Sequence, residues 1–374
     1  MDKNKRLTVW LPVIIAASIA LGIFIGNHYL SISQGKKRSY SSGNKINAIL
    51  DIIDEQYVDT VSMSKLVEST IPKIFSELDP HSVYIPAEDA SVVNEELEGS
   101  FSGIGVSFNM QTDTILVISV ISGGPAEKAG LLPFDRIISI NDSIFSGKKK
   151  NQGEIMKTLR GAKNSTVKLG VQRGNSPELL YFDVTRGDVP VNSVDVSYEA
   201  AKGIGYIKVS KFARNTYNEF ITAIAKLKQA GCTSFVIDLR GNTGGYMDAA
   251  INMINEFMPE GRLIVYTEGK SFPRSDVYAN GTGTCKDAPI VVLTDEISAS
   301  ASEIFSGAIQ DNDRGTIIGR RTYGKGLVQT QMSLSDGSEM RLTIARYYTP
   351  SGRCIHKKYE MGNTDAYDQD IYNR

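Results

Sequence analysis

The sequence predicts a mixed α/β protein in which a β-rich domain is inserted between a leading helical segment and an α/β core. Three observations carry that prediction. Short β-rich runs crowd into residues 99–187, strand-like and helix-like runs alternate from about Gly203 onward, and one long apolar run lies near the amino terminus. A chain of 374 residues has room for two or three domains, and 41% hydrophobic content is normal for globular proteins.

Charge and cysteine content exclude several classes of protein. The chain has 41 basic and 42 acidic side chains, so a net charge of −1 gives no overall attraction to nucleic acid. Cys232, Cys285 and Cys354 form no C-x-x-C pair and have no metal-site spacing to the three histidines. We therefore expect no disulfide framework and no structural zinc site, although a single disulfide with one spare thiol stays open.

The amino terminus has the composition of an export signal or a membrane anchor. Three basic residues precede the apolar run at residues 7–26, and no Lys, Arg, Asp or Glu follows until Lys36. A transmembrane helix needs about 20 apolar residues and a cleavable signal only about 7–15, so the length favours an anchor. A cleavage site at residues 31–33 is the alternative.

The leading segment, residues 46–78, shows the apolar spacing of amphipathic helices, with Pro72 expected to break them. It ends in the sequence LDPHS at residues 78–82. His81 invites a catalytic interpretation, but the Asp-Pro pair before it indicates a turn and favours a structural role.

The β-rich region contains about five short strand-like runs and two short helix-like runs in under 100 residues, as expected of a compact β domain. Residues 122–147, SGGPAEKAGLLPFDRIISINDSIFSG, closely resemble the PDZ pattern. In PDZ domains the backbone N–H groups of a loop bind a peptide's terminal carboxylate, and the peptide adds as a strand at the sheet edge. The resemblance places this loop on Gly103, Ile104, Gly105 and Val106, although a plain turn would also use these glycines. Arg160, after the second helix, either reports ligand occupancy or sits as a cation at a helix C-terminus, and the second interpretation is favoured.

The region after Gly203 predicts an α/β layer fold with largely parallel, buried strands. Within it, ISASASEIF at residues 297–305 places three serines where a strand-like run gives way to a helix-like one. A Ser N-cap is the ordinary interpretation, and a nucleophile is the alternative. No histidine accompanies this stretch in the sequence: His28 lies beside the apolar run, His81 in the leading segment and His356 near the tail.

A lysine is therefore the candidate base. Lys325 lies between two glycines, and burial would have to lower its pKa by several units for it to act as a base. Gln329 lies four residues on, an even spacing that puts both side chains on one strand face, where the amide could orient the amine. A solvated lysine in a surface turn is the plain alternative.

A glycine-rich turn, DLRGNTGG at residues 238–245, follows a strand and opens a helix, so its free N–H groups suit an oxyanion. It lacks the lysine and the spacing of a phosphate loop, which argues against a nucleotide site.

Together, DLRGNTGG, the block from Ser298 to Gln329 and YYTPSGRCI, in that order behind the PDZ-like segment and LDPHS, resemble the C-terminal processing peptidases, also called tail-specific proteases. The resemblance spans roughly residues 45–358 and implies a ClpP/crotonase-like protease core with an inserted PDZ domain. The expected order is an anchor or signal (1–35), a linker and helical segment (36–98), the PDZ domain (99–187), the core (188–358), on which residues 45–98 pack, and a polar tail (359–374).

The family pattern assigns roles to particular residues of this chain. It implies Ser300 as nucleophile, Lys325 as base and Gln329 as the orienting amide, with Ser298 and Ser302 packing or capping. The implied oxyanion donors are the N–H of Ala301 and one N–H from Gly244 or Gly245. Asp311 matches a position that matters in some members, but a helix-terminal role is favoured.

The resemblance implies a serine endopeptidase of a bacterial cell envelope that acts through an acyl-enzyme, with no metal or organic cofactor. The implied partners are protein or peptide substrates recognised by their C-termini and the membrane through the N-terminal helix, with a homo-oligomer left open. The catalytic part would face the periplasm or the exterior, and the PDZ domain could gate the site. The rival hypotheses are a catalytically silent PDZ scaffold of the same fold and a carrier of small molecules or lipids.

Overall fold

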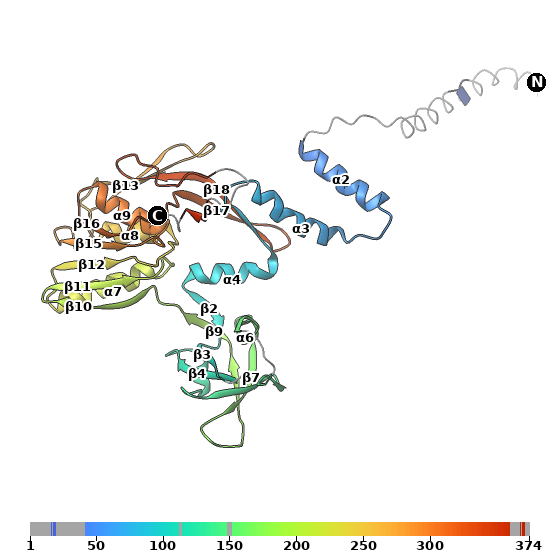
Figure 1. Cartoon of the computed structure of the whole chain (residues 1–374), viewed down its shortest axis with the longest axis horizontal. Helices are drawn as coiled ribbons and strands as arrows, with labels where there is room; N and C mark the ends of the chain where they lie inside the picture. Colours follow the sequence, from blue (N-terminus) through green and yellow to red (C-terminus); the bar gives the residue numbers. More distant parts are fainter. Residues whose placement is uncertain are drawn as a thin grey trace, which may run out of the picture. The chain divides into compact units, whose positions relative to one another are not determined.

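The computed structural model describes residues 42–111, 114–147 and 152–359, together with residues 16, 18, 19, 367, 369 and 370 (Figure 1). Nearly all of the predicted membrane segment at 7–26 lies outside these residues, and no helix among the described ones is long and apolar enough to cross a membrane. The chain divides into two compact units, Met1–Thr70 and Ile71–Arg374.

The leading segment forms helices α2 (Ser42–Gln56) and α3 (Met63–Ser76). The break predicted at Pro72 is wrong, because Pro72 lies inside α3 and the helices part at residues 57–62 instead. A proline removes one backbone hydrogen bond, which a helix with an otherwise amphipathic pattern tolerates.

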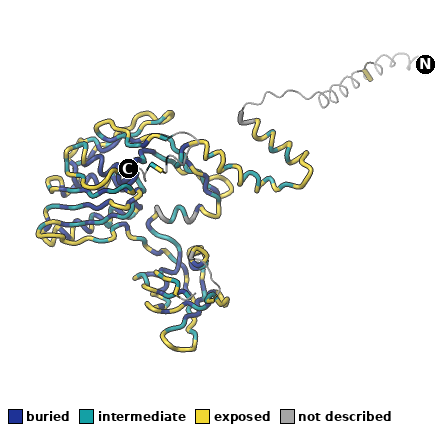
Figure 2. Tube along the Cα trace, in the orientation of Figure 1, coloured by how far each residue is buried: buried dark blue, intermediate teal, exposed yellow. Residues whose placement is uncertain are grey.

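The β-rich region forms a six-stranded antiparallel sheet in the order β3-β4-β5-β7-β8, with β6 on β5. Its strands are β3 (Val106–Gln111), β4 (Thr114–Val120), β5 (Arg136–Ile140), β6 (Ser143–Ile144), β7 (Thr166–Gln172) and β8 (Leu180–Thr185), and its helices are α5 (Pro125–Ala129) and α6 (Gln152–Leu159). Buried and exposed positions alternate along stretches of these strands (Figure 2). The buried strand residues form one apolar cluster with Ile155 of α6. Strand β3 ends this sheet, so one of its edges is not used by another strand of the sheet.

A two-stranded ladder joins the entry and the exit of this domain. Helix α4 (Ala87–Glu98) leads into β2 (Ser100–Gly103), which pairs with β9 (Gly187–Pro190). Between the helix and β2, Gly99 adopts φ 75°, a left-handed conformation that commonly ends helices.

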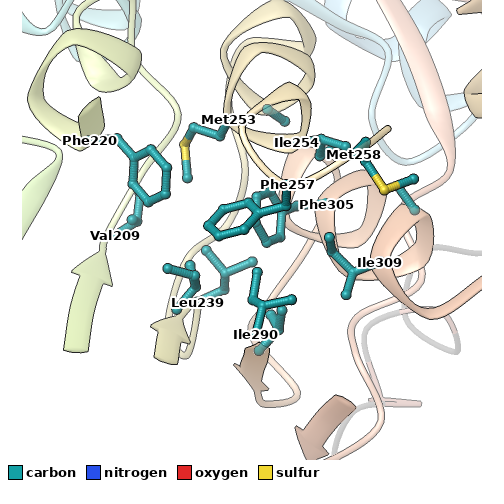
Figure 3. Close-up of a cluster of buried hydrophobic side chains, with 14 of the residues drawn as sticks. Val209, Phe220, Leu239, Met253, Ile254, Phe257, Met258, Ile290, Phe305 and Ile309 are labelled. Atoms are coloured by element: carbon teal, nitrogen blue, oxygen red, sulfur yellow. The ribbon is translucent and has the colours of Figure 1, made fainter. Parts of the chain in front are cut away.

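The core contains the predicted parallel sheet, in the order β10-β11-β12-β15-β16, and the prediction of largely parallel strands is confirmed. Only β10 runs antiparallel to its neighbour. The strands are β10 (Val194–Ala201), β11 (Ile204–Val209), β12 (Ser234–Asp238), β15 (Ile290–Thr294) and β16 (Thr316–Gly319), and the helices are α7 (Thr216–Gln229), α8 (Met247–Asn255) and α9 (Ala301–Asp311). Phe257 packs edge-on against Phe220, Phe235 and Phe305 in the apolar layer between sheet and helices (Figure 3).

A second, antiparallel sheet collects segments that are far apart in the sequence. Its long strand β18 (Glu339–Tyr348) pairs with β17 (Leu327–Ser333), β13 (Leu263–Glu268) and β1 (Val83–Ile85), while β14 (Ser275–Tyr278) pairs with β13. Strand β1 follows LDPHS directly and pairs with β18, whose other edge pairs with β17, the strand that follows Lys325. Within the described residues all three cysteines are free.

Candidate active site

The three serines of the ISASASEIF stretch differ in their environments. Ser298 and Ser302 are fully buried, and their hydroxyls donate to the carbonyls of Leu239 (2.8 Å) and Asn242 (3.0 Å). Ser300 is only partly buried. Its φ of 54° and ψ of −112° form a backbone conformation that is rare for a residue with a side chain and costs of order 1–3 kcal/mol. The fold thus gives Ser298 and Ser302 the structural role expected of them and sets Ser300 apart.

The glycine turn at residues 240–245 lies directly against Ser300. A Cβ on Gly244 would lie 2.7 Å from the Cβ of Ser300, and one on Gly245 would lie 2.1 Å from the carbonyl oxygen of Phe212. The Gly244 N–H donates to Oδ1 of Asn242 (2.8 Å). Gly245 pairs with Phe212 in a parallel β-bridge. The Phe212 N–H donates to the Gly244 carbonyl, and the Tyr246 N–H donates to the Phe212 carbonyl. In such a bridge the N–H of Gly245 points to the opposite edge.

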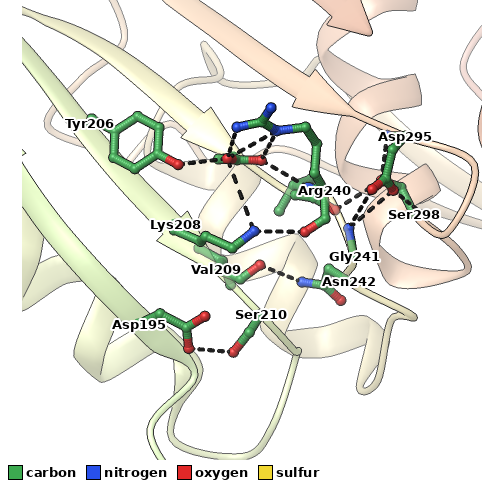
Figure 4. Close-up of polar contacts among 12 residues, drawn as sticks. Asp195, Tyr206, Lys208, Val209, Ser210, Arg240, Gly241, Asn242, Asp295 and Ser298 are labelled. Carbon is green, nitrogen blue, oxygen red and sulfur yellow. Dashed lines mark hydrogen bonds and ion pairs between the residues drawn. The ribbon is translucent and has the colours of Figure 1, made fainter. Parts of the chain in front are cut away.

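Asn242 joins this turn to the serine stretch. Its carbonyl accepts from the N–H of Ala299 and the hydroxyl of Ser302, both at 3.0 Å, and its amide donates to the Val209 carbonyl (3.0 Å). The side chain is fully buried. Asp295 connects the same two segments a second time, because its carboxylate accepts hydrogen bonds from the N–H groups of Gly241 in the turn and Ser298 in the serine stretch (Figure 4).

The start of the turn is held by Asp238, the last residue of β12. Its buried carboxylate accepts from the guanidinium of Arg240 (2.7 Å) and the hydroxyl of Tyr206 (2.6 Å), and the ammonium of Lys208 lies 4.0 Å away (Figure 4). Burial alone would raise the pKa of Asp238, but the bonds from Arg240 and Tyr206 outweigh it and lower the pKa to about 2.

Glu303 connects Ser300 with Lys325. One oxygen of its carboxylate, Oε2, accepts the backbone N–H of Ser300 (2.9 Å) and that of Lys325 (2.8 Å). The other, Oε1, accepts from the N–H of Gly324 (2.6 Å) and the hydroxyl of Thr322 (2.7 Å). Glu303 is 2% exposed, and burial raises its pKa despite these bonds. The hydroxyl of Tyr347, a buried residue of β18, also lies within hydrogen-bond distance of the carbonyls of both Ser300 and Lys325.

Lys325 is partly buried just before β17. Burial is the main cause that lowers the pKa of its ammonium group, and the positive charge of Arg341 lowers it further. The carboxylates of Asp79 and Glu303 act in the opposite direction. The structure therefore shifts this lysine in the direction that a general base requires.

Gln329 makes a contact that the sequence did not suggest. Its amide nitrogen donates to the backbone carbonyl of His81 at 2.5 Å. The ring of His81 lies 6.3 Å from those of Tyr323 and His356. The pKa values of both histidines fall to about 4, mainly through burial, and Lys325 is the next cause for His81. Two histidines that are remote from the serines in the sequence are thus close to the lysine in space, and both are neutral at pH 7.

The predicted peptide loop lies at the start of the edge strand β3. Gly103 ends β2, Ile104 is 3% exposed, Gly105 has φ 78° and Val106 begins β3. The carbonyls of Ile104 and Gly105 accept from Ala126 and Ile121, which fixes the loop on the rest of the domain.

Arg160, which follows α6, pairs with Glu95 of α4 at 3.3 Å and stacks over Phe101. Asp311 ends α9 and accepts from the Ser351 hydroxyl at 2.6 Å, which agrees with its expected helix-terminal role. Among the residues that the structure describes, no group of His, Cys, Asp and Glu is arranged to hold a metal ion.

Comparison with known proteins places the chain in a family. Residues 203–365 match peptidase family S41, and residues 102–195 match the PDZ domain. The "Probable CtpA-like serine protease" of Staphylococcus aureus (strain N315) is 34% identical over 365 residues, which cover 96% of this chain and 72% of that protein. This chain belongs to peptidase family S41. A second relative, the "Carboxy-terminal processing protease CtpB" of Bacillus subtilis (strain 168), is 35% identical over 318 residues, which cover 84% of this chain and 66% of the relative.

The chain therefore spans about two thirds to three quarters of the length of these two relatives. Among solved structures, the "Photosystem II D1 C-terminal processing protease" is similar at 28% identity with a TM-score of 0.47, covering 85% of this S41 peptidase and 91% of that chain. The prediction of a serine-type peptidase with a PDZ domain is confirmed at the level of the family.

Sequence reasoning missed three residues that organise this site. Glu303 follows Ser300 by three positions in the S-x-x-E pattern of a capping box, so the sequence did hold a signal for it. Asn242 has one local partner, the N–H of Gly244, but its bonds to Val209, Ala299 and Ser302 reach other segments, and both partners of Tyr347 lie outside its strand, so no local pattern marks either role.

Proposed function

We propose that this S41 peptidase is a serine endopeptidase of the cell envelope that holds the C-terminus of a protein substrate on its PDZ domain and cleaves peptide bonds with Ser300 and Lys325. The observation that carries the proposal is that the backbone N–H groups of Ser300 and Lys325 both donate to the same oxygen, Oε2 of Glu303. This oxygen holds the two backbones close together. The lowered pKa of Lys325 supports its role as base.

In the proposed reaction, the neutral amine of Lys325 takes the proton of the Ser300 hydroxyl as its oxygen attacks the peptide carbonyl. The N–H of Ala301 and that of Gly245 stabilise the oxyanion, since the N–H of Gly244 is already bonded to Asn242. The tetrahedral intermediate expels the amine, which takes the proton back from Lys325 and leaves an acyl-enzyme. Water then attacks the ester, with Lys325 again as base, and releases the acid and free Ser300.

Substrate capture is proposed at the edge of β3. A peptide strand added there would place its terminal carboxylate at the loop formed by Gly103, Ile104, Gly105 and Val106. The proposal also includes export, with residues 1–35 as an anchor or signal and the catalytic part outside the cytoplasm. The apolar run at residues 7–26 supports this part.

The test uses the purified chain and an unfolded protein with an apolar C-terminus. Ser300→Ala and Lys325→Ala should each lower kcat/KM by roughly 1,000-fold or more, whereas Lys286→Ala, at an exposed lysine of the same core, should leave it unchanged. Amidation of the substrate C-terminus should lower kcat/KM by about 10-fold through a higher KM. Equal cleavage by the wild type and both dyad variants would refute the dyad, and no cleavage by any of them would favour the silent scaffold.

A further inference from the structure

The side chain of Gln329 has one orientation that its surroundings allow. A backbone carbonyl only accepts hydrogen bonds, so the amide group that meets the His81 carbonyl must be the NH₂ group and not the oxygen. The amide oxygen Oε1 then faces away from His81. An ammonium group donates only to an acceptor, so the His81 carbonyl sets which atom of the Gln329 amide, the oxygen, is left to accept a hydrogen bond.

The His81 carbonyl is itself fixed by a buried turn, residues 79–82. Asp79 accepts the N–H groups of His81 and Ser82 through Oδ1, both at 3.0 Å, and the Ser82 hydroxyl through Oδ2 at 2.6 Å. Asp79 is 8% exposed and Ser82 is 4% exposed. A buried carboxylate with three local donors gives this turn a single geometry.

The same turn is anchored to β18 at the position opposite Gln329. Thr343 pairs with Gln329 in the β17–β18 ladder, beside a register shift between Val328 and Gln329. The Thr343 hydroxyl donates to Asp79 (3.1 Å) and its N–H donates to the Ser82 hydroxyl (3.1 Å). A closed ring of contacts therefore runs from Gln329 across the ladder to Thr343, through Asp79 and Ser82, and back through His81.

The geometry points to a positioning role for the Asp79–Ser82 turn: it sets the amide orientation of Gln329 and so gives Lys325 an acceptor for its amine. This inference rests on the proposed function only for its kinetic consequence. None of the turn residues needs to touch the substrate, and the ring of His81 needs no proton transfer for this role.

Other charged and titratable groups surround Lys325 and must be held constant in a test. Arg341, Asp79 and Glu303 act on it electrostatically, and His81 lies near enough to be affected by it. Replacing Asp79 would change the charge beside the lysine as well as the turn. Ser82→Ala removes two anchors of the turn without changing any charge, so it is the cleaner variant.

The chain offers a matched control at the far end of the same hairpin. The hydroxyl of Ser338 donates to Asp336 at 2.6 Å, as that of Ser82 does to Asp79, and Ser338 is also buried. Both variants should lower Tm, Ser82→Ala somewhat more, because its hydroxyl makes two hydrogen bonds and that of Ser338 makes one. Only Ser82→Ala should lower kcat, by about 10-fold, with KM changed less than about 2-fold.

A double-mutant cycle separates positioning from general loosening. Gln329→Ala should lower kcat as Ser82→Ala does, and the two changes together should cost little more than either one, because both remove the same acceptor. Equal losses of kcat in Ser82→Ala and Ser338→Ala, or additive losses in the double variant, would overturn the inference.

A second readout does not depend on cleavage. The ionisation of Lys325, followed by NMR of ¹³C-labelled lysine in the whole chain, should shift to lower pH by about half a unit or more in Ser82→Ala, because the ammonium loses an acceptor. It should not shift in Ser338→Ala. If Ser82→Ala shows this shift but the chain cleaves nothing, the proposed function is refuted and the positioning role stands. If the chain cleaves the substrate but Ser82→Ala shows no shift, the positioning role is refuted and the proposed function stands.

Discussion

Two buried carboxylates hold the segments of this site, and their pKa values move in opposite directions. Asp238 holds the glycine turn and has a pKa lowered to about 2, whereas the pKa of Glu303 at the start of α9 is raised. Both side chains are almost fully buried, and burial by itself raises the pKa of a carboxyl group. Glu303 nevertheless lies deeper in the protein than Asp238, so depth of burial explains one part of the difference.

The charge of the hydrogen-bond donors explains the other part of the difference. Asp238 accepts from the guanidinium of Arg240, with the ammonium of Lys208 nearby, whereas Glu303 accepts only from backbone N–H groups and the Thr322 hydroxyl. Charged donors stabilise a carboxylate more strongly than neutral ones. The glycine turn is therefore held by a carboxylate, Asp238, whose charged form is stabilised. The link between Ser300 and Lys325 is held by Glu303, whose charged form is disfavoured.

The largest effect is expected from Glu303→Ala. It leaves three backbone N–H groups without their acceptor and removes one contact of the Thr322 hydroxyl, and each unpaired buried N–H costs about 1–3 kcal/mol. We expect the free energy of unfolding in urea to fall by about 4 kcal/mol and kcat to fall by roughly 100-fold or more. Gln310→Ala, at an exposed position of the same helix, is the control. A Glu303→Ala variant as stable and active as this control would show that the link is dispensable.

A smaller loss is expected from Asp238→Asn. The variant keeps the size of the side chain but removes its charge, and water can hydrate the half-exposed Arg240 instead. We therefore expect the free energy of unfolding at pH 7 to fall by about 2 kcal/mol. Because the pKa of Asp238 is lower in the folded state, its contribution is present above the usual pKa and is lost as pH falls towards 2. Urea unfolding at pH 6 and pH 2.5 should therefore show the two proteins converging in stability at the lower pH.

The same pH series sharpens the comparison through Glu303→Gln. Because the pKa of Glu303 is raised in the folded state, its effect on stability depends on pH in the opposite sense. Its contribution is fully present below its usual pKa and is lost as pH rises through the raised value. The gap between wild type and Glu303→Gln should therefore change with pH in the opposite sense to the gap for Asp238→Asn. Parallel changes in both gaps would contradict the role given to donor charge.

The sequence was sufficient for the parts of this molecule that depend on local pattern. Strand and helix alternation predicted the parallel sheet, and the resemblance to the C-terminal processing peptidases implied that Ser300, Lys325 and the glycine turn belong to one site. It was insufficient where distant segments pair. The contact of Gln329 with His81 joins positions 248 residues apart, and it exists because β1 and β17 share β18 as a partner. Such pairing depends on tertiary packing, which leaves no periodic signal in either segment.

The smallest effect is expected from Lys208→Ala. Its ammonium lies 4.0 Å from Asp238, beyond direct hydrogen-bond distance, and donates to the Arg240 carbonyl at 2.7 Å. Lysine pairs that reach solvent contribute at most about 1 kcal/mol, so the loss of unfolding free energy should stay below that, with kcat changed less than about 3-fold. Lys226→Ala, on the exposed side of α7, is the control in the same urea titration. If Lys208→Ala instead lowered the free energy of unfolding as much as Asp238→Asn does, the low pKa of Asp238 would depend more on the ammonium than on the guanidinium. The glycine turn would then be held mainly by Lys208 of β11 and not by its own Arg240.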